Sequence, residues 1–273
     1  MELQILESEP QLVAPDTFLI PTLAAQPDGF VAVNSMVIRG AEPVIVDTGC
    51  SLVRDSWLAS TFSVVEPQDV RWIFLSHDDH DHLGNLDAVL ELCPQATLVA
   101  SWAITGRLAG DVPLPVERMR WLDAGDVLDA GDRTLQLVRP PLWDSPTTRG
   151  LYDPTTEVLW AVDSFGALVQ GDVHEADDAD PDLYAMSFAM LNQWNTPWLE
   201  LVDPERFARH LERTATLPLT AVASAHGPIV RGERIAAAFE ATRAFAAQPI
   251  PPMPGQLELE AMLAAFATAE AAA

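Results

Sequence analysis

The 273-residue sequence contains no lysine, so arginine supplies all 15 basic residues, and 40 acidic residues bring the formal net charge to −25 at pH 7. A nucleic-acid-binding protein needs a cationic surface that displaces counterions from phosphates. This chain would instead repel phosphate at long range. We therefore expect no nucleic-acid partner and interpret the acidity as a solvated surface.

Cysteine and long apolar runs are also scarce. Cys50 and Cys93 are the only cysteines and lack CxxC spacing, so no disulfide scaffold is expected and both thiols should be reduced. No stretch is long and apolar enough to span a bilayer, and the first residues, "MELQILESEP", lack the layout of a secretion signal. These absences predict a soluble, cytoplasmic protein without membrane contact.

What the chain does contain is an alternation of apolar strands and helical patterns that occurs twice, as two similar halves. The Pro-rich segment "QPIPPMPG" then interrupts the pattern. We predict one domain over 1–247, followed over 248–273 by a Pro-rich break and a C-terminal helix. Helical spacing marks residues 51–60, 83–92, 182–194, 204–216 and 231–247.

The segment "LSHDDHDHLGN", residues 75–85, places three histidines and three aspartates in six consecutive positions from His77 onward. It follows the apolar strand "WIFL", so these side chains emerge at the carboxyl end of a strand, where α/β proteins build their sites. Crowded carboxylates repel one another and are costly to bury without a cation. A bound metal ion resolves this conflict.

"SHDDHDHLG" resembles the HxHxDHxG signature of the metallo-β-lactamase-like superfamily, whose final DHxG is supplied by Asp81, His82 and Gly84. Counting back from this end places His77 at the first histidine position and Asp79 at the second. The resemblance implies an α/β (α+β) fold, a four-layer αββα sandwich of two mixed sheets with helices outside.

The resemblance extends over about residues 30–232. Asp47 in "EPVIVDTG" matches the aspartate that usually supports the metal ligands. Asp163 in "VLWAVDSFG" matches the bridging carboxylate, and His226 in "SAHGPIVRG" matches the last histidine. The complete set of metal ligands that the resemblance implies is His77, Asp79, Asp81, His82, Asp163 and His226.

Within the superfamily the chain is most similar to the di-iron branch, the flavodiiron and oxygen-binding di-iron proteins. That branch replaces the second histidine by a carboxylate, and Asp79 is a shorter version of the same replacement. The similarity implies two divalent metal ions. An oxygen-rich ligand set favours iron first, then manganese, with zinc third.

One position departs from the family pattern, because Leu142 in "RPPLWDSP" stands where a histidine ligand is expected. Asp144, two residues further on, is the alternative ligand if the loop is shifted. Two interpretations of the missing ligand stay open. It leaves a coordination position for oxygen or substrate, or the first metal site has weakened and one ion remains.

Several further residues have a functional and a structural interpretation. His80 is either a proton relay or an exposed loop residue, Cys50 faces the pocket or packs beneath it, and His174 is a loop ligand or a surface residue. His210 lies near Arg206, Arg209 and Arg213 in the sequence, so we interpret it as part of an exposed charged face. Three tryptophans either line the pocket or belong to the core: Trp143, Trp194 and Trp198.

The preferred function is that of a non-haem di-iron oxidoreductase that binds or reduces a small oxidant, dioxygen or nitric oxide. Only about forty residues follow "SAHGPI", too few for a flavin-binding domain, so electrons would come from a separate donor protein. A homodimer would fit the resemblance. The alternative is a hydrolase of an ester, lactone, thioester or amide, with a metal-bound hydroxide and Asp81 as general acid and base. A non-catalytic scaffold is the third possibility.

Overall fold

The computed structural model describes residues 4–110 and 112–272. Its first half begins with seven strands and continues with helices that alternate with three further strands. The elements are β1 (Ile5–Glu7), β2 (Gln11–Ala14), β3 (Thr17–Ile20), β4 (Thr22–Gln26), β5 (Gly29–Ala32), β6 (Ser35–Ile38), β7 (Val44–Val46), α1 (Arg54–Val64), β8 (Trp72–Phe74), α2 (His80–Leu83), α3 (Leu86–Leu92), β9 (Thr97–Ala100), α4 (Trp102–Leu108) and β10 (Met119–Trp121).

The second half repeats this order with a run of strands before its helices. Its elements are β11 (Val127–Asp129), β12 (Thr134–Val138), β13 (Gly150–Asp153), β14 (Val158–Trp160), α5 (Pro181–Trp194), α6 (Pro204–Ala215), β15 (Ala221–Ala223), β16 (Val230–Arg231), α7 (Glu233–Ala244) and α8 (Gln256–Ala272). Short 3₁₀ turns flank several of these helices.

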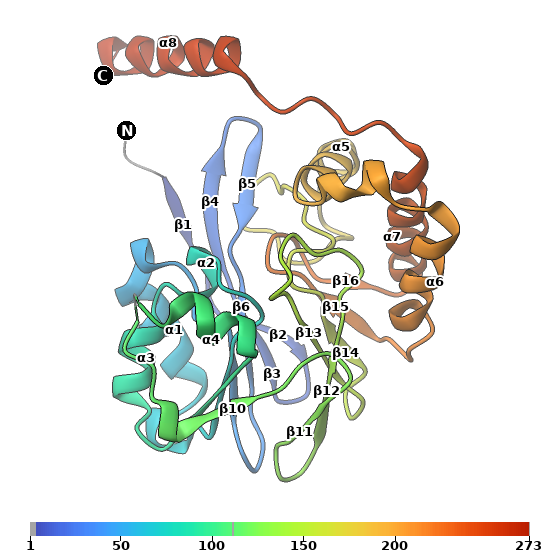
Figure 1. Cartoon of the computed structure of the whole chain (residues 1–273). Helices are drawn as coiled ribbons and strands as arrows, with labels where there is room; N and C mark the ends of the chain where they lie inside the picture. The colour runs from blue at the N-terminus through green and yellow to red at the C-terminus, as the bar shows by residue number, and fades with distance from the viewer. Residues whose placement is uncertain (1–3, 111, 273) are drawn as a thin grey trace.

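Two mixed sheets face each other at the centre of the molecule (Figure 1). One has seven strands in the order β10-β9-β8-β7-β6-β3-β2, and the other has six in the order β11-β12-β13-β14-β15-β16. Strands β7, β8 and β9 run parallel, as do β14 and β15. Their carboxyl ends therefore lie at a common edge, which is the place where the polar signature segment begins.

The alternation of side chains along β7 explains how the layers adhere. Val44 and Val46 point into the core between the two sheets, whereas Ile45 packs under α1, α3 and α4 on the outer face. All three side chains are fully buried, and each contributes about 1.5–3 kcal/mol through removal of apolar surface from water. A continuous apolar run thus holds the strand from both faces.

The six-stranded sheet has its own outer helical layer, in which Phe188 of α5, Phe207 of α6 and Phe239 of α7 pack over Leu159 and Val222. The order of layers is helices, sheet, sheet, helices. This confirms the predicted αββα sandwich. The predicted helical segments correspond to α1, to α2 with α3, to α5, to α6 and to α7, with shifted bounds.

Two parts of the fold have no counterpart in the predicted pattern. A small third sheet, with the order β1-β4-β5, joins the sandwich through a bridge between Phe30 and Val169. Helix α4 follows β9 after Ser101, whose Oγ caps the helix by accepting from Ile104 N. None of the helices in the described residues is both long and apolar enough to cross a membrane.

The C-terminal helix α8 extends away from the sandwich in Figure 1. In the Pro-rich segment before it, the carbonyl of Pro251 accepts a hydrogen bond from Trp194 Nε1 of α5 at 2.9 Å. The division of the chain after residue 247 stays a prediction.

Gly84 ends α2 at a point where two backbone segments meet. Its N–H donates to the carbonyl of Gly49 at 2.8 Å, and a Cβ atom at this position would collide with that carbonyl and with the backbone nitrogen of Ser51. These are backbone atoms, so no side-chain rotation relieves the contact. The space between the β7–α1 loop and α2 thus admits only glycine.

We expect Gly84→Ala to lower the free energy of unfolding by about 1–3 kcal/mol, because overpacking forces the backbone apart. Gly106 in α4 is the matched control, since nothing lies within 4 Å of its added Cβ. Gly106→Ala should stabilise by about 0.5–1 kcal/mol through helix propensity. Chemical denaturation of both variants checks this, and equal stabilities would contradict the packing argument.

Candidate metal centre

The polar side chains of the signature segment meet those of two other loops at the carboxyl edge of both sheets. His77 follows β8, Asp163 follows β14, and His226 follows β15. Asp81 and His82 lie in the short helix α2, whose N-cap residue is Asp79. Three segments that are distant in sequence therefore contribute to one site.

Asp163 lies at the centre of the site and faces all three imidazoles. Its Oδ2 is 3.4 Å from His77 Nε2. Its Oδ1 is 3.2 Å from His82 Nε2 and 3.3 Å from His226 Nε2. The two oxygens of one carboxylate thus point toward different histidines, which is the arrangement expected of a bridging ligand.

The remaining acidic side chains divide the site into two positions. Asp81 Oδ2 lies 3.4 Å from His226 Nε2 and 3.8 Å from His82 Nε2, and these three residues could hold one ion. Asp79 Oδ2 lies 3.7 Å from His77 Nε2, and this pair forms the second group together with Asp144. The structure thus brings together all six ligands predicted from the sequence, and with them Asp144, which the sequence left as an alternative.

Hydrogen bonds at Nδ1 fix which nitrogen each histidine offers. His226 Nδ1 donates to the carbonyl of Ala32 at 2.9 Å, and His82 Nδ1 donates to Asp47 Oδ2 at 3.0 Å. Ser76 Oγ donates to the same Asp47 oxygen at 2.7 Å, so it can accept from His77 Nδ1 at 3.0 Å. In each ring Nε2 is therefore free to bind a metal.

Asp47 organises this hydrogen-bonded layer. Besides His82 and Ser76 Oγ it accepts the backbone N–H of Ser76 at 2.7 Å, and it is completely buried. Its backbone has a φ of 59°, in the left-handed region that non-glycine residues seldom adopt. The sequence comparison found Asp47, but Ser76 was missed because no pattern distinguishes this serine from others at strand ends.

The buried polar atoms of the site fit a cation. His77 Nε2, His82 Nε2 and Asp163 Oδ1 are inaccessible to solvent and have no hydrogen-bond partner in the described part of the chain. Such groups cost free energy when they are left unpaired. Imidazole nitrogens and carboxylate oxygens are ordinary ligands of iron, manganese and zinc, so the donor set matches the predicted metal centre.

The charges of the site also favour a bound cation. Burial opposes ionisation of Asp163, but the neighbouring His77, His82 and His226 outweigh it and hold the pKa of this carboxyl well below its usual range. Burial likewise disfavours a charged His82, yet the carboxylates of Asp163 and Asp47 raise its pKa well above the ordinary value. Positive charge next to Asp163 thus stabilises its ionised carboxylate.

The backbone leading to Asp163 is strained. Val162 has a φ of 56°, which is unfavourable for a β-branched residue and costs about 1–3 kcal/mol. Its carbonyl accepts the N–H of Ala225 at 2.7 Å and the hydroxyl of Ser224 at 3.3 Å. These contacts fix the strand end so that Asp163 and His226, on neighbouring loops, approach each other.

Leu142 does not face the metal positions. Its side chain is 2% exposed and packs in the outer core with Tyr152 and Phe165. Its N–H donates to Ser164 Oγ and its carbonyl accepts from the same hydroxyl, both at 3.0 Å. Asp144, two residues later, is the side chain of this loop that reaches His77 and Asp79.

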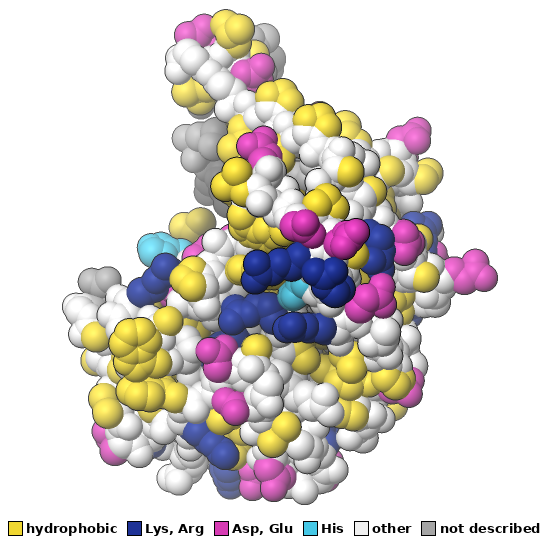
Figure 2. All heavy atoms as spheres, turned by 45° about the vertical axis from the view of Figure 1, so that its right-hand side comes forward, with side chains coloured by type: hydrophobic (Ala, Val, Ile, Leu, Met, Phe, Trp, Pro, Cys, Tyr) yellow, Lys and Arg dark blue, Asp and Glu magenta, His cyan; other side chains and the backbone are white. Residues whose placement is uncertain are grey.

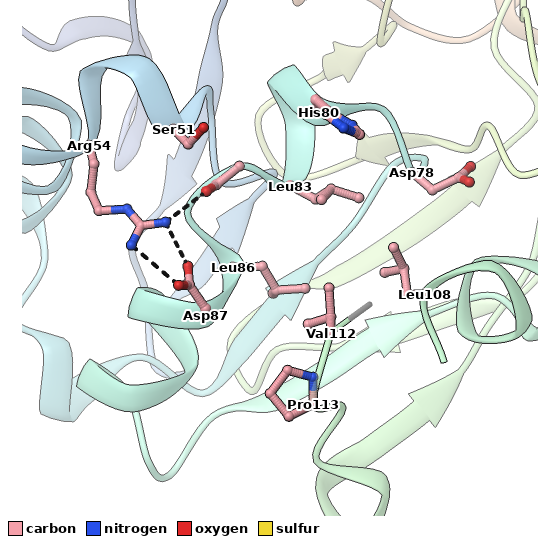
Figure 3. A pocket seen from close by; sticks show the side chains of 11 residues that line it. Ser51, Arg54, Asp78, His80, Leu83, Leu86, Asp87, Leu108, Val112 and Pro113 are labelled. Carbon is pink, nitrogen blue, oxygen red and sulfur yellow. Dashed lines mark hydrogen bonds and ion pairs between the residues drawn. The ribbon is translucent and has the colours of Figure 1, made fainter. Parts of the chain in front are cut away.

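Alternate residues of the signature segment face away from the metal positions and line a cavity of about 620 Å³ (Figure 3). His80 is exposed on this side, at the rim with Leu83, while Asp78 pairs with Arg107 at 3.1 Å. His80 therefore lies on the far side of α2 from the ligands, in agreement with the exposed-residue interpretation.

The other candidate residues lie outside the ligand cluster. His174 pairs with Asp172 at 2.8 Å in its own loop, and Cys50 is a free, half-buried thiol. Trp198 Nε1 donates to the carbonyl of Trp143 at 2.7 Å, and the two rings pack at 4.6 Å between centroids. This pair supports the loop that carries Asp144.

Comparison with known proteins identifies the family. The model described as ODP family beta lactamase matches residues 31–227, more than half of the chain. The chain belongs to this family. Diflavin flavoprotein A 1 from Synechocystis sp. is 30% identical to this ODP-family chain over 200 residues, which cover 72% of the chain and 34% of the relative. The chain spans about a third of the length of the curated relatives it matches.

Solved structures show the same fold. The flavodiiron protein from Giardia intestinalis superposes with a TM-score of 0.77 at 20% identity, covering 88% of this ODP-family chain and 60% of that protein. Rubredoxin oxygen:oxidoreductase from Desulfovibrio gigas gives 0.73 at 16% identity, covering 88% and 62%. The predicted metallo-β-lactamase-like fold and its similarity to the di-iron branch are confirmed.

We expect Asp47→Ala to weaken Fe(II) binding by about 10–100-fold, because His82 and Ser76 lose the acceptor that orients them. Chelator competition under anaerobic conditions measures the affinity. The control is Asp87→Ala, which removes an exposed partner of Arg54 and should leave the affinity unchanged. Equal affinities of the two variants would show that Asp47 does not orient the ligands.

Proposed function

We propose that this chain is a non-haem di-iron oxidoreductase that binds or reduces a small oxidant, dioxygen or nitric oxide. The observation that supports the proposal best is the division of the ligands into two groups around Asp163, whose two oxygens lie close to different histidines. A pair of iron ions held there would supply two electrons and adjacent binding positions for a diatomic molecule. The family of the chain and its flavodiiron neighbours agree with this proposal.

The residues of the chain have separate tasks in this proposal. His82, His226 and Asp81 would hold one ion, and His77 with Asp79 would hold the other. Asp163, which faces both groups, would be shared between them. Asp81 and Asp79 are partly exposed, with side-chain accessibilities of 33% and 51%, so the oxidant would enter on their side. The fully buried His77 and His82 lie at the base of the site.

The composition of the site favours redox chemistry over hydrolysis. Histidine-rich ligand sets suit zinc, whereas oxygen ligands favour iron or manganese. Asp79 stands where such a set has a histidine, so it shifts the preference toward iron or manganese. The alternative hydrolase, with Asp81 as general acid and base, stays the second prediction, to be decided by metal identity. The predicted homodimer is likewise part of the proposal.

Electrons would come from a separate protein, and one surface fits an acidic donor. Arg206, Arg209 and Arg213 lie along one side of α6 at helical spacing, and all are exposed. Burial is the main cause of the lowered pKa of His210, and the nearby Arg213 and Arg139 lower it further. Figure 2 shows dark blue side chains gathered on this face around a histidine. We call Arg139, Arg206, Arg209 and Arg213 the arginine face.

The arginine face adjoins the metal centre. The guanidinium of Arg139 lies 5.9 Å from the centre of the Trp143 ring, and this ring lies 4.8 Å from that of His210. Asp144 follows Trp143 directly in the sequence. In a chain of net charge −25, a basic face beside the site would select and orient an acidic partner.

The first experiment is elemental analysis of protein purified without added metal or chelator, followed by reaction of the reduced protein with dioxygen and nitric oxide. We expect about two iron ions per chain, as in other two-metal sites, and consumption of at least one oxidant. His226→Ala should abolish the reaction. Bound zinc with ester or lactone hydrolysis, and no reaction with either oxidant, would favour the hydrolase instead.

For the donor surface, we expect the double variant Arg206→Glu/Arg213→Glu to lower the rate of oxidation of reduced rubredoxin by about tenfold at low salt. The wild-type rate should also fall as salt is added. Arg71→Glu, an exposed arginine after the 3₁₀ turn before β8, is the control. An oxidation rate that does not change with salt concentration, or an equal loss of rate in Arg71→Glu, would exclude docking at the arginine face.

A further inference from the structure

We propose that Asp144 is the missing protein ligand of the metal position defined by His77 and Asp79, and that it replaces the histidine expected at Leu142. The proposal rests on the metal centre proposed above and assigns its incomplete half. One carboxylate oxygen of Asp144 lies with an oxygen of Asp79 and a ring nitrogen of His77 in a group whose atoms are all within 4.8 Å of one another.

Leu142 is unable to take this role for a reason beyond its chemistry. The Ser164 hydroxyl binds both its N–H and its carbonyl, next to Asp163 in the sequence. Its side chain is thereby directed into the core between the six-stranded sheet and its helices. The loop then continues through Trp143 before Asp144 turns back toward His77.

Hydrogen bonds orient the Asp144 carboxylate. Thr148 Oγ1 donates to its Oδ1 at 3.0 Å, so Oδ2 can bind an ion. The same loop is tied to the signature segment, because Thr147 Oγ1 donates to Asp78 Oδ1 at 2.6 Å. The first hydrogen bond orients the Asp144 carboxylate, and the second fixes its loop beside the segment that carries His77 and Asp79.

An acidic side chain near other acidic side chains is common on protein surfaces, but this group contains a buried nitrogen that needs a partner. His77 is 0% exposed, and its Nε2 has no hydrogen-bond partner among the described residues. Because its Nδ1 is hydrogen-bonded to Ser76, the lone pair of Nε2 points toward Asp79, Asp144 and Asp163. A cation satisfies the nitrogen and the three carboxylates together.

Asp144 also completes the charge balance. Asp79, Asp81, Asp144 and Asp163 carry four negative charges, which equal the charge of two divalent ions. The two positions become unequal, since one has a single histidine and three carboxylates and the other has two histidines and two carboxylates. The carboxylate-rich position should prefer manganese or iron, and the histidine-rich position should bind zinc more readily.

The test loads wild type and variants with Fe(II) anaerobically, removes free metal and counts the bound iron per chain. We expect about two ions in wild type and about one in Asp144→Ala, because one position loses a ligand. Asp144→Glu, which keeps the carboxylate, should restore about two. Asp123→Ala is the matched control, since Asp123 is an exposed acid that pairs with Arg139 at 3.8 Å, near the same loop.

Either of two outcomes would overturn the assignment: undiminished iron in Asp144→Ala, or a single iron in wild type. Leu142→His in the Asp144→Ala background should not recover the lost iron, because position 142 faces the core. Asp144 is exposed, so the metal-free variants should melt at the wild-type temperature, and this measurement excludes unfolding as the cause of lost iron.

The result is separable from the proposed function. If wild type binds two irons and Asp144→Ala binds one, the ligand assignment holds even where the reduced protein reacts with neither oxidant. In that case only the redox proposal fails. If both proteins bind two irons and wild type consumes an oxidant, the function holds and the role of Asp144 is rejected.

Discussion

The carboxylate of Asp163 is the group on which the arrangement of this site depends. It is almost completely buried, and three imidazole nitrogens approach its two oxygens within 3.2–3.4 Å. A buried negative charge is tolerated only with compensating positive charge. The strained backbone at Val162, the hydrogen bonds that turn each Nε2 inward and the strand ends that carry the histidines all serve this requirement.

The sequence predicted the parts of the site that belong to contiguous motifs. His77, Asp79, Asp81 and His82 were identified because their spacing matches a known signature, and Asp163 and His226 because "VLWAVDSFG" and "SAHGPIVRG" resemble loops of the same family. The αββα layers followed from the same resemblance. The fold prediction is confirmed, and the structure brings the six side chains together because the strand that precedes each motif places it at the same edge of the sheets.

The loop from Pro140 to Arg149 marks the limit of that reasoning. The sequence places Leu142 at the position of a ligand and leaves Asp144 as an alternative, and nothing local decides between them. The outcome depends on Ser164, which lies 22 residues away and holds the backbone of Leu142 through its hydroxyl. Ser76 and the carbonyl of Ala32 could not be predicted from the sequence either, because the hydrogen-bond partners of histidine ring nitrogens have no characteristic spacing in the sequence. The small β1-β4-β5 sheet was missed because strand patterns do not show which strands pair, and β1 pairs with β4 across the intervening β2 and β3.

Burial of Leu142 has a thermodynamic consequence for the whole centre. An apolar side chain in place of a histidine attaches the loop to the core by about 1.5–3 kcal/mol of hydrophobic stabilisation, and this attachment is present without any ion. Binding that must first order a loop loses conformational entropy of about 1–2 kcal/mol for each residue fixed. Here that entropy is lost when the protein folds. The loop would thus already be in place when a metal binds, so an ordering step would not reduce the affinity.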